Sequence, residues 1–118
     1  MATRVFIVED EPLLARGLRR LLVSDGFEIA GCVGSLKSAL ALSDNIDCDI
    51  ALLDVNLRGE LVTPVADVLR QRGRPIVFLS GYSRSDLPEV FRDFPFLSKP
   101  FDANDLVALI RQNLKRVS

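Results

Sequence analysis

Short apolar runs alternate with longer stretches of helical period along this chain, and this alternation limits its fold more than any other feature. The runs 5–8, 50–53 and 76–79 are apolar at every position, which is typical of strands buried on both faces of a sheet. Two less regular runs, 27–33 and 94–98, are expected to form two further strands. The pattern therefore predicts five strands.

Helix signals lie between these runs. The expected helix starts carry a capping side chain or an early proline, and they stand at Pro12, Ser35, Thr63-Pro64 and Asp102. Gly26 and Gly73 stand where the first and third helices should end. Segment 82–91 differs, because it is polar and carries Pro88, so the fourth helix should be short, irregular or mobile.

Strands that alternate with helices predict a parallel sheet with helices on both of its faces. Right-handed crossovers leave few topologies for such a sheet. We expect a doubly wound, flavodoxin-like α/β fold with five parallel strands in the order 2-1-3-4-5. The length of 118 residues suits a single domain over residues 1–118.

The composition excludes several classes of function. Lys and Arg number 15 and Asp and Glu number 16, so the net charge of -1 gives no pull toward nucleic acid or an anionic membrane. The absence of histidine excludes a Ser-His-Asp triad, a His-ligated zinc and a histidine pH switch. A histidine in any phosphoryl relay must therefore come from a partner.

The cysteines and the apolar runs indicate where the protein works. Cys32 and Cys48 form no CxxC, so we interpret both as small buried residues rather than as disulfide or zinc ligands. The longest apolar run is 106–110, whereas a membrane helix needs about 20 residues. Strand-like sequence begins by Arg4, which leaves no room for a signal peptide. We expect a protein of the reducing cytoplasm.

Polar residues follow four of the five expected strands at the point where each strand ends. Glu9 and Asp10 follow the first strand, Asp54 the third, Ser80 the fourth and Lys99 the fifth. Because the carboxyl ends of parallel strands meet at one edge of the sheet, these side chains should converge. Two carboxylates about 5 Å apart repel by roughly 3 kcal/mol at an effective dielectric near 20, so three of them favour a bound cation. An all-oxygen site suits Mg²⁺.

This set of groups suits phosphoryl transfer, in which catalysis consists of positioning and charge stabilisation. Asp54 would be both metal ligand and nucleophile. Lys99 would neutralise the remaining negative charge and hold a phosphoryl oxygen, and the Ser80 hydroxyl would donate to another. Each residue alone also has an ordinary explanation, as a helix-start acid, a turn former, a cap or a solvated lysine. Their joint placement at the strand ends is what indicates a site.

Over its whole length the chain resembles a bacterial response-regulator receiver domain. The stretches 5–12, 52–57, 78–81 and 96–101 carry this resemblance through their order and spacing. It implies that Asp54 accepts a phosphoryl group from the phosphohistidine of a partner kinase, and that Ser80 and Lys99 contact that group. The ligands that it implies for Mg²⁺ (or Mn²⁺) are the side chains of Glu9, Asp10 and Asp54 and the backbone carbonyl of Asn56.

The resemblance also implies a conformational switch. Phe96 stands three residues before Lys99, where the family keeps its switch aromatic, although it is equally well interpreted as a core phenylalanine. Ser80 would move toward the phosphoryl group, and Phe96 would turn into the space it leaves. That movement would reshape the face of the fourth helix, fifth strand and last helix. The bond between Lys99 and Pro100 is usually cis in the family.

Residues 78–82, Phe-Leu-Ser-Gly-Tyr, are similar to the Phe-Ala-Thr-Gly-Tyr motif of stand-alone receivers with a reduced fourth helix, which work beside kinases of the HWE type. Ser80 stands where Thr is usual, and Glu9 replaces the commoner Asp. Tyr82 either covers the phosphorylation site or is a half-exposed loop aromatic. No helix-turn-helix follows the last helix, so the chain is either a single-domain receiver or a piece of a longer protein.

The resemblance implies a signalling module that assists its own aspartyl phosphorylation and dephosphorylation, rather than an enzyme. Its expected partners are a sensor histidine kinase or phosphotransfer protein and a downstream protein, with no nucleic acid or membrane, and we expect a monomer or weak dimer. An aspartyl-phosphate phosphohydrolase would need an acid where Asn56 stands. A nucleotide or flavin binder would need a Gly-rich loop where the acidic stretch 9–12 stands. A pseudo-receiver that acts only by binding is disfavoured by the intact acid, hydroxyl and lysine set.

Overall fold

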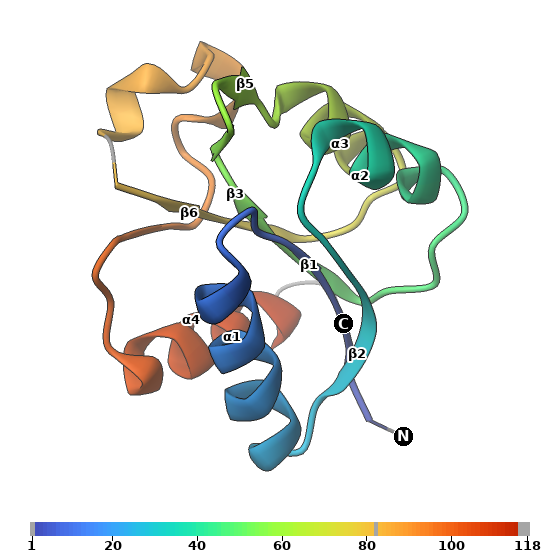
Figure 1. Cartoon of the computed structure of the whole chain (residues 1–118), viewed down its shortest axis with the longest axis vertical. Coiled ribbons are helices and arrows are strands. Elements are labelled where there is room, and N and C mark those ends of the chain that lie inside the picture. Colours follow the sequence, from blue (N-terminus) through green and yellow to red (C-terminus); the bar gives the residue numbers. More distant parts are fainter. Residues whose placement is uncertain (1, 82, 116–118) are drawn as a thin grey trace.

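The computed structural model in Figure 1 describes residues 2–81 and 83–115. Helices and strands alternate along the chain, as the sequence predicts. In order, the elements are β1 (Arg4–Val8), α1 (Pro12–Ser24), β2 (Glu28–Val33), α2 (Leu36–Ser43), β3 (Ile50–Asp54), β4 (Asn56–Leu57), β5 (Glu60–Leu61), α3 (Thr63–Gln71), β6 (Ile76–Ser80), the 3₁₀ helices η1 (Arg84–Asp86) and η2 (Glu89–Phe91), β7 (Phe96–Ser98) and α4 (Ala103–Lys115).

Five strands form one parallel sheet in the order β2-β1-β3-β6-β7. This is the predicted 2-1-3-4-5 order of a doubly wound α/β fold, so the predicted fold class is confirmed. The structure adds an antiparallel hairpin, β4 paired with β5, directly after β3. The sequence predicts only a loop at that place, because each strand of the hairpin is two residues long.

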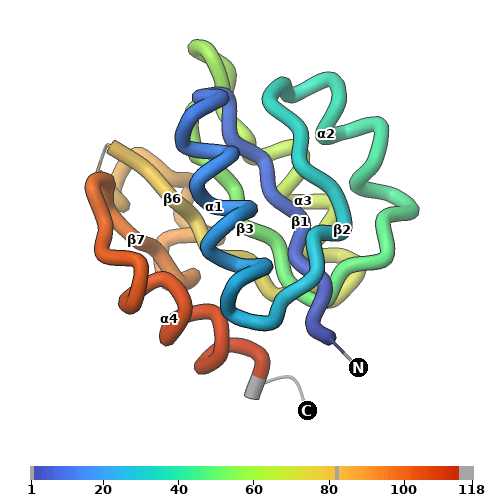
Figure 2. The backbone as a smooth tube through the Cα atoms, turned by 60° about the horizontal axis from the view of Figure 1, so that its bottom comes forward, coloured from blue at the N-terminus to red at the C-terminus, as the bar shows by residue number. Residues whose placement is uncertain are grey.

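Helices cover both faces of the sheet: α1 and α4 lie on one face, and α2 and α3 lie on the other (Figures 1 and 2). Alternate residues of β1 point into the two cores. Val5 and Ile7 pack with α1 and α4, whereas Phe6 and Val8 pack with α2 and α3. The doubly apolar pattern of the strand is therefore explained by burial on both sides.

The expected helix boundaries are present. The Ser35 side chain accepts a hydrogen bond from the backbone N–H of Ser38 at 3.1 Å, and Asp102 Oδ1 accepts one from the N–H of Asn104 at 2.7 Å. Gly26 and Gly73 follow the ends of α1 and α3 with φ values of 94° and 72°, a region that favours glycine.

Segment 83–94 replaces a regular fourth helix with η1 and η2, as the polar sequence with Pro88 predicts. Only Leu87 and Phe91 are buried within this segment. The Phe91 ring packs edge-on against Phe78 and Phe94, with centroids 5.5 and 5.1 Å away. The expected strand 94–98 is shortened to β7.

The cysteines differ from one another. Both are free thiols, and Cys48 is buried as expected, but Cys32 is only half-buried because β2 is an edge strand of the sheet. Burial raises the pKa of both thiols. None of the helices in the described part of the chain combines the length and the apolar character needed to cross a membrane.

Candidate functional site

The carboxyl ends of the central strands lie level with one another. In the sheet register Val8 pairs with Leu53, and Asp54 pairs with Leu79, so Glu9 and Asp54 leave the sheet at the same edge. The strand ends therefore converge as the parallel topology requires.

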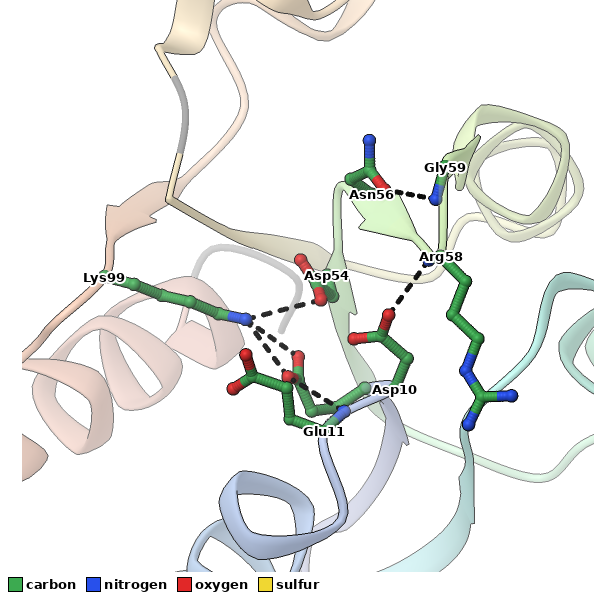
Figure 3. Close-up of polar contacts among 8 residues, drawn as sticks. Asp10, Glu11, Asp54, Asn56, Arg58, Gly59 and Lys99 are labelled. Atoms are coloured by element: carbon green, nitrogen blue, oxygen red, sulfur yellow. Dashed lines mark hydrogen bonds and ion pairs between the residues drawn. The ribbon is translucent and has the colours of Figure 1, made fainter.

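The amino group of Lys99 lies between two buried carboxylates. Lys99 Nζ donates to both carboxylate oxygens of Glu9 at 3.1 Å and to Asp54 Oδ2 at 3.3 Å. The Glu9 side chain is fully buried, and those of Asp54 and Lys99 are 7% and 19% exposed. Figure 3 shows Lys99 reaching across the site toward Asp54. The three groups form a charge-paired cluster at the edge of the sheet, which is how buried charges are tolerated.

Asp10 is oriented by the β4–β5 hairpin, a contact that sequence reasoning missed. Asp10 Oδ2 accepts a hydrogen bond from the backbone N–H of Arg58 at 2.9 Å (Figure 3). Arg58 has a φ of 52°, and the turn is closed by the Gly59 N–H, which donates to Asn56 Oδ1 at 2.8 Å. The turn-forming Asn56 and Gly59 were the available sequence signal, but they did not reveal the contact with a residue 48 positions away.

Glu9, Asp10 and Asp54 together offer carboxylate oxygens that lie within 4.8 Å of one another. A cluster of carboxylates is the donor set that a hard divalent cation such as Mg²⁺ prefers. Three carboxyl groups so close together favour a positive partner, and Lys99 contacts only two of them. The donor chemistry of the cluster therefore fits a cation beside Asp10.

The buried surroundings shift the ionisation of this cluster. Burial raises the pKa of Asp54 to about 7, the hydrogen bond and negative charge of Glu9 add to the rise, and Lys99 opposes it. Burial by itself lowers the pKa of Lys99, but the hydrogen bond to Glu9 and the charges of both carboxylates outweigh burial and raise it. Lys99 is thus held as a cation, whereas metal-free Asp54 is only partly ionised near neutral pH.

The remaining predicted site residues occupy three different environments. Ser80 is buried at the end of β6, pairs in register with Ser98, and its carbonyl accepts the Lys99 N–H at 2.7 Å. Phe96 is half-buried and packs against the α2–α3 side of the sheet. Asn56 lies at the start of β4, two residues after Asp54. Tyr82 lies outside the described residues.

Comparisons with known sequences show the family of this chain. The profile of the response regulator receiver domain matches residues 5–111. The transcriptional regulatory protein PdtaR of Mycobacterium tuberculosis is 33% identical over 117 residues, which is 96% of this chain and 57% of the relative. The sensory transduction protein RegX3 of Mycolicibacterium smegmatis is 39% identical over 118 residues, 97% of this chain and 51% of the relative. The chain spans about half the length of these curated relatives.

Solved structures extend the likeness to the whole fold. The solution structure of SdrG from Sphingomonas melonis Fr1 is 40% identical, has a TM-score of 0.83, and covers 96% of this chain and 97% of its own. The receiver domain of PhyR from Erythrobacter litoralis is 30% identical with a TM-score of 0.83, and it covers 97% of this chain and 91% of its own. The strand order and the sequence profile thus agree, and the chain belongs to the response-regulator receiver family.

Proposed function

We propose that this chain is a phosphorylatable receiver that takes a phosphoryl group onto Asp54 from the phosphohistidine of a sensor histidine kinase or a phosphotransfer protein. The observation that carries the proposal is the position of Lys99 Nζ, within 3.3 Å of Asp54 and 3.1 Å of Glu9. An ammonium held there neutralises the negative charge that an incoming phosphoryl group brings.

The chemistry follows from the side chains at the strand ends. An Asp54 carboxylate oxygen attacks phosphorus while the bond between phosphorus and the partner's imidazole nitrogen breaks, and the imidazole leaves with the bonding electron pair. Lys99 and the Ser80 hydroxyl hold the transferring oxygens. Glu9, Asp10, Asp54 and the Asn56 carbonyl would hold Mg²⁺ or Mn²⁺, which would supply positive charge to those oxygens.

The site favours signalling over metabolic hydrolysis. A phosphohydrolase of this chemistry needs a general acid two residues after the nucleophile, but Asn56 stands there and its amide oxygen is bound by the Gly59 N–H. The complete set of acids, hydroxyl and lysine argues against a pseudo-receiver. We therefore expect a cytoplasmic signalling module, a monomer or weak dimer, whose partners are proteins rather than nucleic acid or membranes, with residues 1–118 as one receiver domain.

Phosphorylation is tested by incubating the protein with acetyl phosphate and Mg²⁺ and measuring its intact mass. We expect the wild type to gain one phosphoryl group and Asp54→Asn to gain none. Asp47→Asn is the matched control, because the Asp47 side chain is 87% exposed and lies away from the cluster. Equal labelling of wild type and Asp54→Asn would exclude Asp54 as the acceptor.

The output surface is the second part of the proposal. Ser80 moves toward the phosphoryl group, Phe96 turns inward, and the face formed by η1, η2, β7 and α4 changes shape. Chemical shifts of the protein with and without beryllofluoride and Mg²⁺ test this, and unchanged shifts around Ser80 and Phe96 would contradict it.

Tyr82 is proposed to cover the site, so Tyr82→Ala should speed hydrolysis of the acyl phosphate. An unchanged rate of acyl phosphate hydrolysis in Tyr82→Ala would exclude that role.

A further inference from the structure

Arg84, in the first 3₁₀ helix, joins two parts of the molecule through one guanidinium group. Its Nη1 donates to the backbone carbonyl oxygen of Arg92 at 2.8 Å and to that of Phe94. Its Cζ lies over the Phe96 ring, 5.0 Å from the ring centroid, within the range of a cation–π contact. A single exposed side chain therefore contacts segment 83–94 and the first residue of β7.

The ring that Arg84 covers is tied to the phosphorylation site through β7. Phe96 pairs in register with Phe78, and Ser98 pairs with Ser80, at the end of the same short strand. Lys99 follows Ser98 directly, and its N–H donates to the Ser80 carbonyl. Phe96 therefore lies only three positions before Lys99, and Ser98 of the same strand pairs with Ser80.

We propose that Arg84 is a positioning residue that holds the Phe96 ring in its half-buried place and so opposes the inward turn of the ring. The inward ring would have to give up the guanidinium contact, whereas the outward ring keeps it. An interaction made in only one of two conformations shifts their populations by its own strength. The inference rests on the proposed function for the link to phosphorylation, but the Arg84–Phe96 contact is testable without it.

The expected size of the effect follows from the exposure of Arg84. A cation–π contact at an exposed site changes the ratio of the two ring positions by roughly two- to fivefold. Removing the guanidinium should therefore raise the affinity for beryllofluoride with Mg²⁺ by roughly the same factor, since the binding-competent conformation becomes more populated.

Arg92 provides a matched control. It belongs to the same segment and also donates to a backbone carbonyl there, from Nε to Leu87 at 3.0 Å. Among the described residues no contact joins Arg92 to Phe96. Arg92→Gln therefore loosens the segment without removing a cation from the ring, and it separates tethering from the ring contact.

The experiment uses the full chain and measures two quantities for wild type, Arg84→Gln, Arg84→Lys and Arg92→Gln. The first is the chemical shift of the Phe96 ring in the metal-free protein. The second is the affinity for beryllofluoride with Mg²⁺. We expect Arg84→Gln to move the ring signals toward their beryllofluoride-bound positions and to raise the affinity, Arg84→Lys to do so less because it keeps a cation, and Arg92→Gln to change neither. In a Phe96→Leu background, Arg84→Gln should have no further effect on affinity.

Two outcomes would overturn the inference. One is an unchanged Phe96 ring signal in Arg84→Gln, and the other is an equal rise in affinity for Arg84→Gln and Arg92→Gln, which would assign the effect to tethering alone. Failure of the proposed function would give a different result. The wild type would then neither bind beryllofluoride nor gain a phosphoryl group, whereas Arg84→Gln would still change the Phe96 ring signal of the metal-free protein and Arg92→Gln would not.

Discussion

The edge of the sheet that carries the acids and segment 83–94 beside it are built on opposite principles. Every residue of β3 and of β6 is buried, so the side chains at the ends of these strands are held in fixed positions. Segment 83–94 buries only Leu87 and Phe91, and arginine side chains that donate to backbone carbonyls supply much of its remaining support. One region is held by packing on both sides, and the other by two buried side chains together with surface hydrogen bonds.

This difference in stabilisation indicates that segment 83–94 can change conformation more easily than the acidic edge of the sheet. A fully buried Glu9 has to keep its partner Lys99, because an unpaired buried charge is strongly destabilising. Hydrogen bonds of the kind made by Arg84 and Arg92 contribute about 0.5–1.5 kcal/mol each, so a small change in charge or contact can rearrange the segment. The fold thus places a rigid site next to a segment whose surface contacts can rearrange at a small cost in free energy.

Phe91→Ala gives the largest expected effect and tests whether the segment has a core of its own. The ring is buried and contacts Phe78 and Phe94, so its removal should lower the free energy of unfolding by about 3–5 kcal/mol. Urea unfolding measures this, with Val90→Ala as the control, because Val90 is 52% exposed. A loss for Phe91→Ala as small as that of the control would mean that the segment contributes nothing to the packed fold.

Lys99→Met tests whether the acidic edge depends on its cation. Without metal at pH 7, removing the ammonium leaves Glu9 and Asp54 without their shared partner, which should lower the free energy of unfolding by about 3 kcal/mol. The loss of stability should shrink as the pH falls below about 7, because Asp54, whose pKa is raised to about 7, becomes protonated and needs no cation. Urea unfolding at pH 7 and at a lower pH measures this difference. Lys37→Met on the exposed side of α2 is the control, and an equal effect of the two would contradict the charge-paired cluster.

Asp54→Asn tests the raised pKa of the acceptor. The pKa of Asp54 is 3.8 in an ordinary environment and about 7 in the fold, so the native state binds the proton more tightly than the unfolded chain. That contribution to stability is present below pH 3.8 and is lost as the pH rises through about 7. Metal-free Asp54→Asn does not lose stability in this way, because asparagine does not ionise. At pH 8 its free energy of unfolding should therefore be higher than that of the wild type by on the order of 2 kcal/mol. Parallel stability profiles from pH 4 to 8 would contradict the shift.

Arg58→Gly gives the smallest expected effect. Arg58 has a φ of 52°, which is unfavourable for any residue with a Cβ, and its backbone N–H is what contacts Asp10. Glycine keeps that N–H and relieves the strain, so the free energy of unfolding should rise by about 0.5 kcal/mol and Mg²⁺ affinity should stay the same. Arg70→Gly, inside α3, should instead lower stability by about 1 kcal/mol. A fall in metal affinity for Arg58→Gly would show that the guanidinium, rather than the amide, serves the site.

The amino-acid sequence by itself determined the sheet order and which residues stand at the strand ends. Runs such as 50–53 are apolar on both faces, and parallel strands place Glu9, Asp54 and Lys99 at one edge whatever the details of packing. The polar segment with Pro88 also predicted its own irregularity. These features follow from local periodicity and from the few topologies that it permits.

Only the tertiary structure decided which partner each side chain took. The sequence predicted that Lys99 neutralises the acids and holds a phosphoryl oxygen, but it did not indicate that the ammonium pairs with Glu9, 90 positions away, as well as with Asp54. No sequence motif indicated the hydrogen bond from the Arg58 amide to Asp10 or the contact of the Arg84 guanidinium with the Phe96 ring. The physical reason is that periodicity encodes which face of an element is buried, whereas contacts between distant polar groups depend on where a turn or an irregular segment comes to rest against the packed sheet.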